Sequence, residues 1–177
     1  MIVLPDILAP ALKVVFCGTA VSDESAARGH YYSKPSNAFW QLLHHAGFTS
    51  RQLLPEEDHV LPSLGIGMTD LVKQVAQSHD RNLDYSGGRS VAAHIELAAP
   101  EWVAFNGKTA ARAAAKILGH PNPAGLGIAE FGIGASGVFV LPSSSAANRG
   151  TKGLDGRATR LEWWAELASL AGFAKVT

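Results

Sequence analysis

The sequence contains a single cysteine, Cys17, among its 177 residues. One cysteine cannot form an intramolecular disulfide, nor can it supply a cysteine-based zinc or iron–sulfur site. Because Cys17 falls within a short apolar run, we expect it to be an inert core residue. The chain also has no apolar run close to the ~20 residues that a membrane-spanning helix needs. These absences favour a soluble cytoplasmic protein without a membrane partner.

The sequence has no excess of either charge, because 15 Lys and Arg residues balance 15 Asp and Glu residues. A chain without net positive charge has no general affinity for polyanions, so any nucleic-acid-binding surface must be local. Residues 1–10 lack basic residues and contain two prolines, and we do not expect them to be a signal peptide. Hydrophobic residues make up 47% of the chain, which suits the core of one globular domain spanning 1–177.

Short apolar runs alternate with amphipathic stretches along the chain. This alternation predicts an α/β fold with a mainly parallel sheet. The segments 52–62, 77–87 and 120–127 are polar and are expected to be connections. Strands are predicted at 13–17, 102–105 and 137–141, and helices at 39–46, at 88–98, in the alanine-rich stretch ending at residue 118, and at 161–171.

The stretch 14–40 is the richest in chemically useful side chains. Its apolar strand ends at Gly18, and a long loop follows before Ser36 and Asn37, which are expected to cap the next helix. Long loops inside compact domains are usually functional. This loop leaves the carboxyl end of a strand, where open α/β sheets place their ligands. It carries two acids, a histidine and two tyrosines, namely Asp23, Glu24, His30, Tyr31 and Tyr32.

The sequence Gly107-Lys108-Thr109 resembles part of a phosphate-binding loop. The full motif needs a glycine five residues before Gly107, and that position holds Trp102. A strand–turn–helix connection is therefore favoured for this segment.

Two further features leave alternatives open. Asp70 is the only acid in the otherwise apolar run 65–72, so it is either a capping residue or a site residue, with capping slightly favoured. Residues 143–160 are rich in Ser, Gly and Ala and carry four basic residues against one acid. Such a segment is either a solvated connector or a surface that binds phosphates.

Five segments occur in a characteristic order. They are LPDILAPALKVVFCG at 4–18, the stretch 29–40 with its GHYY, Pro35 and NAFW, GIGMTDLV at 65–72, VAFNGK at 103–108 and LPSSSA at 141–146. Their order and spacing resemble the thymine/uracil mismatch-specific branch of the uracil-DNA glycosylase superfamily, over about residues 5–146. The resemblance implies a three-layer α/β/α fold with a short central sheet. It also implies a monomer that needs no metal or cofactor.

The resemblance implies an enzyme of DNA repair. It would flip a uracil, or a thymine mispaired with guanine, out of DNA and hydrolyse its N-glycosidic bond. The sugar then develops positive charge while the base leaves as an anion, so the site needs donors to the base and a positioned water. We therefore expect a monofunctional uracil-DNA glycosylase, associated with the nucleoid when it acts on DNA. Two rival readings are a non-catalytic protein that binds uracil-containing DNA and a hydrolase of free nucleosides.

The resemblance also assigns residues to a base pocket and to a DNA-binding surface. Tyr32 matches the aromatic residue on which the flipped base stacks, and ordinary core packing is the alternative for it. The expected pocket residues are Gly18, Thr19, Ala20, Ser22, Tyr32 and Asn106. The expected DNA contacts are His30, Lys108, Ser143, Ser144, Ser145, Ala147, Asn148 and Arg149.

The first motif departs from the family pattern. Ala20 stands where the family has an asparagine that positions the attacking water, and a methyl group cannot hold water. Two acids are candidates to replace it. We predict that Asp23 orients or deprotonates the water, although it could instead stabilise the first turn of a helix that begins at Ser22. Asp70 stands in place of a base-reading asparagine and is predicted to be a helper or a substitute.

A second departure concerns the residue that fills the hole left by a flipped base. The family has a long wedge residue here, whereas this chain has Ala147. Asn148 and Arg149 are long enough to take its place. We expect weak retention of abasic product.

Overall fold

A five-stranded sheet forms the centre of the molecule. The computed structural model describes residues 1–148 and 159–173. The strand order is β2-β1-β3-β5-β4, in which β4 alone runs antiparallel to its neighbour. This confirms the prediction of a mainly parallel sheet. The strands are β1 (Val14–Ala20), β2 (Ile66–Val72), β3 (Trp102–Asn106), β4 (Gly127–Ile133) and β5 (Ser136–Leu141).

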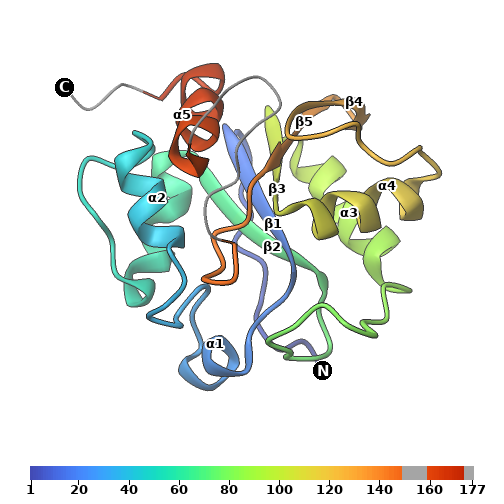
Figure 1. Ribbon diagram of the computed structural model, residues 1–177, viewed down its shortest axis with the longest axis horizontal. Helices are drawn as coiled ribbons and strands as arrows, with labels where there is room; N and C mark the ends of the chain where they lie inside the picture. The colour runs from blue at the N-terminus through green and yellow to red at the C-terminus, as the bar shows by residue number, and fades with distance from the viewer. Residues whose placement is uncertain (149–158, 174–177) are drawn as a thin grey trace.

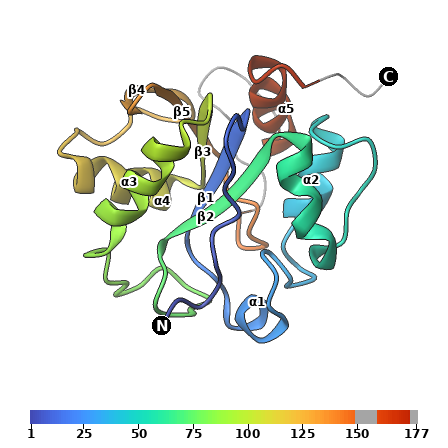
Figure 2. The ribbon, with the colours of Figure 1, turned by 180° about the vertical axis from the view of Figure 1, so that it is seen from behind.

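Helices cover both faces of the sheet and complete a three-layer α/β/α fold (Figure 1). Residues alternate in direction along a strand, so Phe16 of β1 enters one core and Cys17 enters the other. Figure 2 shows the same two helical layers from behind. One layer contains α2 (Phe39–His45), α5 (Arg160–Leu170) and the 3₁₀ helix η1 (Pro55–Leu64), and the other contains α3 (Gly88–Ala98) and α4 (Lys108–Leu118).

Aromatic side chains join α2 and α5 to the sheet. The ring of Phe16 makes an edge contact with Phe39 of α2 and stacks on Trp164 of α5, with ring centroids 5.3 and 5.5 Å away. Trp164 is fully buried, and its Nε1 donates a hydrogen bond to the carbonyl of Pro142, just after β5. The closing helix is therefore fastened to the strand that leads into the serine-rich segment.

The structure confirms most predicted elements, adds the strands β2 and β4, which were not predicted, and corrects two expectations. The helix α3 has the predicted bounds, and Cys17 is buried in the core. Asp70 lies in the interior of β2, so the prediction that it caps an element was wrong. Strand β4 was not predicted, because its alternating pattern contains two glycines. The 3₁₀ helix occupies a segment expected to be a plain connection.

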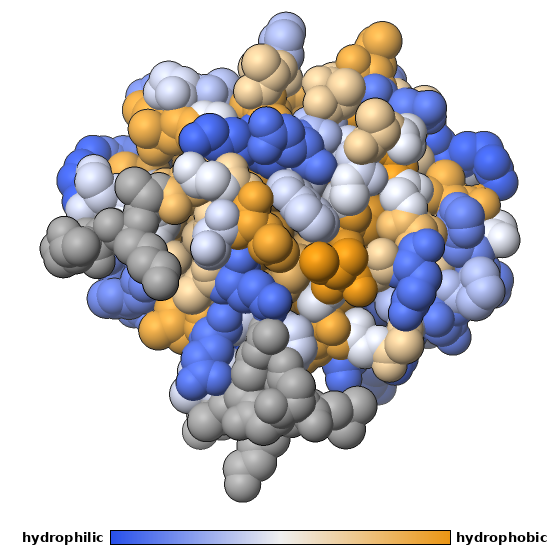
Figure 3. Space-filling view, turned by 90° about the horizontal axis from the view of Figure 1, so that it is seen from above, coloured by the Kyte–Doolittle hydropathy of each residue, from blue (hydrophilic) through white to orange (hydrophobic). Residues whose placement is uncertain are grey.

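The parallel strands all end at one edge of the sheet. After β1 the chain forms the short helix α1 (Asp23–Arg28), at the bottom of Figure 1, and the segment after β5 reaches toward the same end. Figure 3 shows the opposite end of the molecule, where polar and apolar residues are interspersed. Among the described residues, no helix is both long enough and apolar enough to span a membrane.

Candidate functional site

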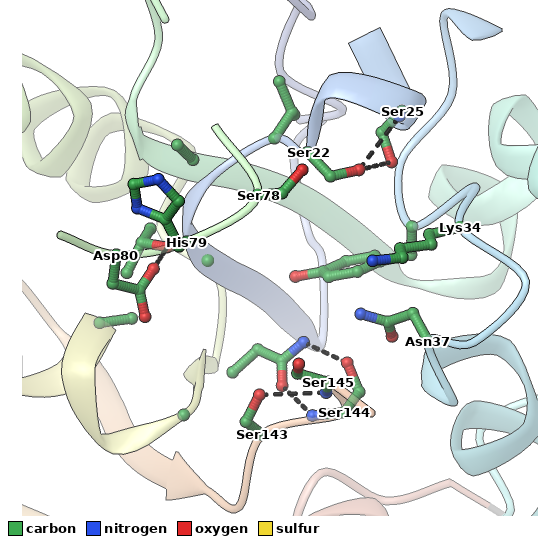
Figure 4. A pocket seen from close by; sticks show the side chains of 18 of the residues that line it. Ser22, Ser25, Lys34, Asn37, Ser78, His79, Asp80, Ser143, Ser144 and Ser145 are labelled. Carbon is green, nitrogen blue, oxygen red and sulfur yellow. Dashed lines mark hydrogen bonds between the residues drawn. The ribbon is translucent and has the colours of Figure 1, made fainter. Parts of the chain in front are cut away.

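A pocket of about 510 Å³ lies at the carboxyl ends of the parallel strands. Its walls come from the loop after β1, the segment after β2, the first turn of α4 and the serine-rich segment after β5. This is the edge at which the sequence predicted a ligand site. Figure 4 shows labelled side chains on several sides of the cavity, namely Ser22, Ser25, Lys34, Asn37, Ser78, His79, Asp80, Ser143, Ser144 and Ser145.

Asp70 lines this pocket from the interior of β2. It is 3% exposed and pairs with Gly18 in the β1–β2 register. Its Oδ1 lies 2.6 Å from the point that a Cβ on Gly18 would occupy, so a glycine is needed there. Its Oδ2 is buried without a hydrogen-bond partner among the described residues.

Burial changes the acidity of this carboxyl group. Desolvation raises the pKa of Asp70 to about 7, the Lys73 ammonium opposes the rise, and Asp6 adds to it. The Asp70 carboxyl therefore gains or loses its proton near neutral pH. Perturbed acids of this kind are typical of functional sites.

Tyr32 brings a hydroxyl group to the same place. Its Oη lies 3.2 Å from the Cβ position of Gly18 and makes no hydrogen bond of good geometry with the described residues, although the nearby Asn106 side chain acts to lower its pKa. Burial and the neighbouring Asp70 raise the pKa of Tyr32, so the hydroxyl keeps its proton. Its ring stacks on Phe39 with centroids 4.1 Å apart. Tyr32 therefore both packs on the core and lines the pocket. We call Gly18, Tyr32 and Asp70 the pocket floor.

The preceding residue, Tyr31, holds this part of the loop in place. Its hydroxyl accepts a hydrogen bond from Lys73 Nζ at 3.1 Å, and Lys73 also pairs with Asp6 at 2.6 Å. Trp40 Nε1 donates to the carbonyl of Tyr31. These contacts stabilise the left-handed backbone of Tyr32, whose φ of 53° is uncommon for a tyrosine.

The first motif supplies one wall of the pocket. Thr19 Oγ1 donates to the carboxylate of Asp80 at 2.5 Å, which joins the end of β1 to the segment after β2. Ala20 lines the pocket and offers only a methyl group. Ser22 caps α1, where its Oγ accepts a hydrogen bond from the N–H of Ser25. Thr19, Ala20 and Ser22 thus all line the pocket, and their contact with a flipped base stays a prediction.

Asp23 and His30 are not among the residues that line the pocket. Asp23 is exposed in the first turn of α1, and its carboxylate accepts a hydrogen bond from Ser78 at 2.8 Å. His30 Nδ1 contacts the carboxylate of Asp58 at 3.1 Å. The alternative considered for Asp23, stabilisation of a helix that begins at Ser22, matches its observed place.

Asn106 fastens the serine-rich segment to β3. Its Oδ1 accepts a hydrogen bond from the N–H of Ser144 at 2.9 Å, and its Nδ2 donates to Ser144 Oγ at 2.8 Å. Ser144 is fully buried. Both residues line the pocket, but their polar groups are engaged with each other.

The rest of the serine-rich segment is held by its own hydrogen bonds. Ser143 Oγ accepts from the N–H of Ser145, and Asn148 Nδ2 donates to the carbonyl of Ser143. Arg160 Nη1 lies 3.1 to 3.2 Å from the carbonyls of Ser143, Ser145 and Asn148. We call residues 142–148 the serine loop. Its backbone is fixed by the first residue of α5.

The remaining predicted DNA contacts lie at the rim or outside the described residues. Lys108 is exposed in the first turn of α4 and lines the pocket. Ala147 is exposed and also lines it, whereas Asn148 is folded back onto the serine loop. Arg149 falls outside the described residues, as does most of the basic stretch that follows it.

Sequence reasoning missed two groups of pocket residues. The segment after β2 contributes Ser78, His79 and Asp80, and the loop after β1 contributes Lys34 and Asn37. The segment 73–87 leaves the carboxyl end of β2, and that position alone marked it as a wall of the site. The described residues hold no cluster of three or more His, Cys, Asp or Glu side chains that could bind a metal ion.

The fold and the site define a three-layer α/β protein with a ligand pocket at the carboxyl edge of its sheet. The chain belongs to the uracil DNA glycosylase superfamily, whose family model matches residues 5–168. It is therefore a member of a family of DNA-acting glycosylases.

A comparison with solved structures supports the same fold. The chain is similar to the solution NMR structure of a candidate uracil DNA glycosylase from Methanosarcina acetivorans, with a TM-score of 0.56 and 24% sequence identity. The match covers 94% of this chain and 96% of that chain. At this level of identity, the likeness bears on the fold alone.

Proposed function

We propose that the protein is a monofunctional uracil-DNA glycosylase of the thymine/uracil mismatch-specific type, which excises uracil from DNA and leaves an abasic site. The observation that carries this proposal is the pocket floor. The Asp70 carboxyl and the Tyr32 hydroxyl meet at Gly18, and neither Asp70 Oδ2 nor Tyr32 Oη makes a hydrogen bond of good geometry with the described residues, in a chain of this superfamily. Buried polar groups without partners are costly and are usually retained for a ligand.

The proposed reaction separates a base from its sugar. The N1–C1′ bond breaks, its electron pair leaves with the base, and water adds to C1′ and loses a proton. The Tyr32 side chain and the Asp70 carboxyl group contact the flipped base, and the pocket volume of about 510 Å³ accommodates one nucleotide. Donors placed at the departing base stabilise its negative charge.

Lys108 and Lys34 at the pocket rim are the basic residues that support contact with the DNA backbone. A salt titration separates this proposal from the hydrolysis of free nucleosides. Binding to DNA loses affinity steeply as salt rises, because counterions are released from the phosphates, whereas binding of a neutral nucleoside does not.

The direct test is cleavage of end-labelled oligonucleotides that contain one uracil, either single-stranded or opposite G or A, followed by alkali. We expect strand breaks with the wild type. Asp70→Leu keeps a side chain branched at Cγ but removes the polar group from the floor, and its excision rate is expected to fall about 100-fold or more. Asp23→Asn is expected to stay within about twofold of the wild type, because Asp23 is exposed and lies outside the pocket lining.

Other outcomes have definite meanings. If Asp23→Asn gave no strand breaks, Asp23 would be the catalytic acid. If the wild type bound uracil-containing DNA but left it intact, the protein would be a non-catalytic reader of damaged DNA. Ala20 favours that second reading, because its methyl group cannot position the attacking water.

A further inference from the structure

A buried ion pair lies next to Tyr31, one of the residues that line the pocket. Lys73, the first residue after β2, is 8% exposed, and its Nζ lies 2.6 Å from Asp6 Oδ1. Thr69 Oγ1 donates a hydrogen bond to the same oxygen at 2.6 Å. Neither Lys73 nor Asp6 is among the residues that line the pocket. Desolvation offsets much of the attraction between buried charges, so such a pair is weak evidence of a purely stabilising role.

Tyr31 is the residue through which this ion pair reaches the pocket. Lys73 Nζ donates to the Tyr31 hydroxyl at 3.1 Å and lies 5.7 Å from the centroid of the Tyr31 ring. The hydroxyl in turn donates to the carbonyl of Pro5 at 3.0 Å. The Tyr31 ring is buried and its hydroxyl is bonded on two sides, so the ring cannot shift without breaking one of these bonds.

The N-terminal segment 3–7 brings Asp6 to this place. Ile7 of this segment and Met68 of β2 exchange two backbone hydrogen bonds, of 2.8 and 2.9 Å. Strand β2 lies at one edge of the sheet, so the segment covers an edge that would otherwise be free. The position of Asp6 is therefore fixed by the sheet itself.

Tyr32 follows Tyr31 directly and depends on its position. The φ of 53° at Tyr32 lies in the left-handed region, which a tyrosine adopts only where its surroundings hold it. In this conformation the Tyr32 ring stacks on Phe39, and its Oη lies 3.2 Å from the Cβ position of Gly18. A return to an ordinary backbone conformation would turn the side chain away from both of these contacts.

We infer that Lys73 is a positioning residue of the pocket, which together with Asp6 fixes Tyr31 and so holds the Tyr32 ring where a flipped base stacks. The inference rests on the proposed function for the identity of the base, whereas the position of the ring depends on the protein alone. When the ion pair is lost, DNA whose bases all stay stacked should bind as before. Only a flipped base loses its stacking partner.

The test compares the binding of two oligonucleotides. They carry one 2′-fluoro-2′-deoxyuridine or one 2′-fluoro-2′-deoxycytidine at the same position, because the fluorine destabilises the sugar cation and blocks excision. The double variant Lys73→Met, Asp6→Asn removes both charges, and its amide can still accept from Thr69. Its Kd for the uracil probe is expected to rise about tenfold, the order of effect that one base–aromatic stack has on binding. Its Kd for the cytosine probe is expected to change less than about twofold.

Two single variants separate positioning from a general loss of structure. Tyr31→Phe keeps the ring and the ion pair but loses the hydroxyl, so its uracil-probe Kd is expected to rise about fivefold, and this test stands even if the double variant fails to fold. Arg51→Met is the matched control, because it breaks an exposed ion pair with Glu57 outside the pocket lining and should leave both Kd values unchanged. An equal rise for both probes in Tyr31→Phe would overturn the inference.

A mutant cycle tests whether Lys73 acts through Tyr32. Tyr32→Ala weakens binding of the uracil probe directly. Adding Lys73→Met and Asp6→Asn to Tyr32→Ala should then raise that Kd by less than about twofold, because the ring to be positioned has already gone. Full additivity of the two effects would contradict the inference.

The position of the Tyr32 ring is also measurable without DNA. The chain has three tyrosines, so their ring resonances in ¹³C-tyrosine-labelled protein can be assigned by single substitutions to phenylalanine. Stacking on Phe39 shifts the Tyr32 resonances, and the double variant and Tyr31→Phe should both lose much of that shift. Such a loss, in a protein that neither excises uracil nor distinguishes it from cytosine, would refute the proposed function and leave this inference standing. Excision by the wild type, with Tyr32 resonances and base discrimination unchanged in both variants, would do the reverse.

Discussion

The pocket floor and the serine loop form two sides of one pocket, but they differ in whether their polar groups are hydrogen-bonded within the protein. On the floor, the Asp70 carboxyl and the Tyr32 hydroxyl each have a buried atom without a protein partner. In the serine loop, the buried Ser144 is bonded twice to Asn106, and three loop carbonyls are bonded to Arg160. The polar groups of the serine loop are hydrogen-bonded within the protein, whereas the pocket floor has two buried polar atoms that a ligand could bind.

This difference distinguishes a structural part of the pocket, the serine loop, from a ligand-binding part, the pocket floor. A polar group that already has its hydrogen bonds must break them to hold a ligand, which largely cancels the gain. The serine loop is therefore best understood as a fixed wall that presents its backbone and its outer hydroxyls to DNA. The unpartnered floor is the part whose energy improves when a base enters. Substitutions on the pocket floor and in the serine loop should accordingly have different effects on stability and on its dependence on pH.

The largest expected effect is on the floor, as a pH-dependent change in stability. The pKa of Asp70 is about 7 in the folded protein against 3.8 as its ordinary value. Between these values the native state holds a proton that the unfolded state has lost, so stability falls as pH rises from about 4 to 7. The loss amounts to about 4 kcal/mol. Asp70→Asn lacks this titration. The unfolding free energy of Asp70→Asn relative to that of the wild type should therefore increase by that amount as pH rises.

Urea denaturation of the wild type and Asp70→Asn at pH 4.5, 6 and 8 measures this growth, of which about 3 kcal/mol falls within that range. Comparing the two proteins at each pH cancels the other titrating groups. Asp23→Asn is a matched control, because it makes the same change at an exposed acid, where the burial that drives the effect at Asp70 is absent. If the difference in unfolding free energy between the wild type and Asp70→Asn did not change with pH, the Asp70 carboxyl group would be well hydrogen-bonded in the protein. The proposed contrast between the pocket floor and the serine loop would then be wrong.

The second effect concerns the wall. Asn106→Ala removes both hydrogen bonds to Ser144 and leaves a buried N–H and hydroxyl without partners, so the free energy of unfolding should fall by about 2 kcal/mol. This loss should not depend on pH. Adding Ser144→Ala should cost less in the Asn106→Ala background than in the wild type, because the partner has already gone. Urea midpoints of the four proteins test this, and simple additivity would contradict the pairing.

The sequence was sufficient to predict the fold class and the edge of the sheet that carries the pocket. Apolar runs such as 102–105 and the amphipathic stretch 88–98 reflect burial directly, so their elements were confirmed. Strand β4 was missed, because an edge strand with glycines and exposed residues has no strong hydrophobic pattern. The position of Asp70 in a buried strand was also not predicted, because an acidic residue is not expected in the interior of a buried apolar strand.

The candidate site was predicted less completely, because it depends on contacts between distant segments. Nothing in the local sequence indicates that Thr19 meets Asp80, or that Asn106 and Ser144 satisfy each other. The prediction for Asp23 followed from its closeness in sequence to Ala20. In the structure, Ala20 ends β1 and lines the pocket, whereas Asp23 is the first residue of α1, is exposed and lies outside the pocket lining. Closeness in sequence did not place the two residues in the same environment, because the chain passes from strand to helix between them.

The smallest expected effect sharpens the description of the serine loop as a fixed wall. Arg160→Met keeps the length of the side chain but removes the hydrogen bonds to the carbonyls of Ser143, Ser145 and Asn148. The guanidinium is half-buried and the carbonyls can be rehydrated, so the loss in unfolding free energy should be about 1 kcal/mol.

Arg160→Lys tests whether charge or geometry holds the loop. The ammonium keeps the charge but loses the planar guanidinium, so it should restore only part of the stability. If the loop acts as a wall, Arg160→Met should weaken binding to all DNA by a few-fold, without changing the preference for uracil over cytosine. A change in that preference would mean that the serine loop also reads the base, and the division between a satisfied wall and an unsatisfied floor would no longer hold.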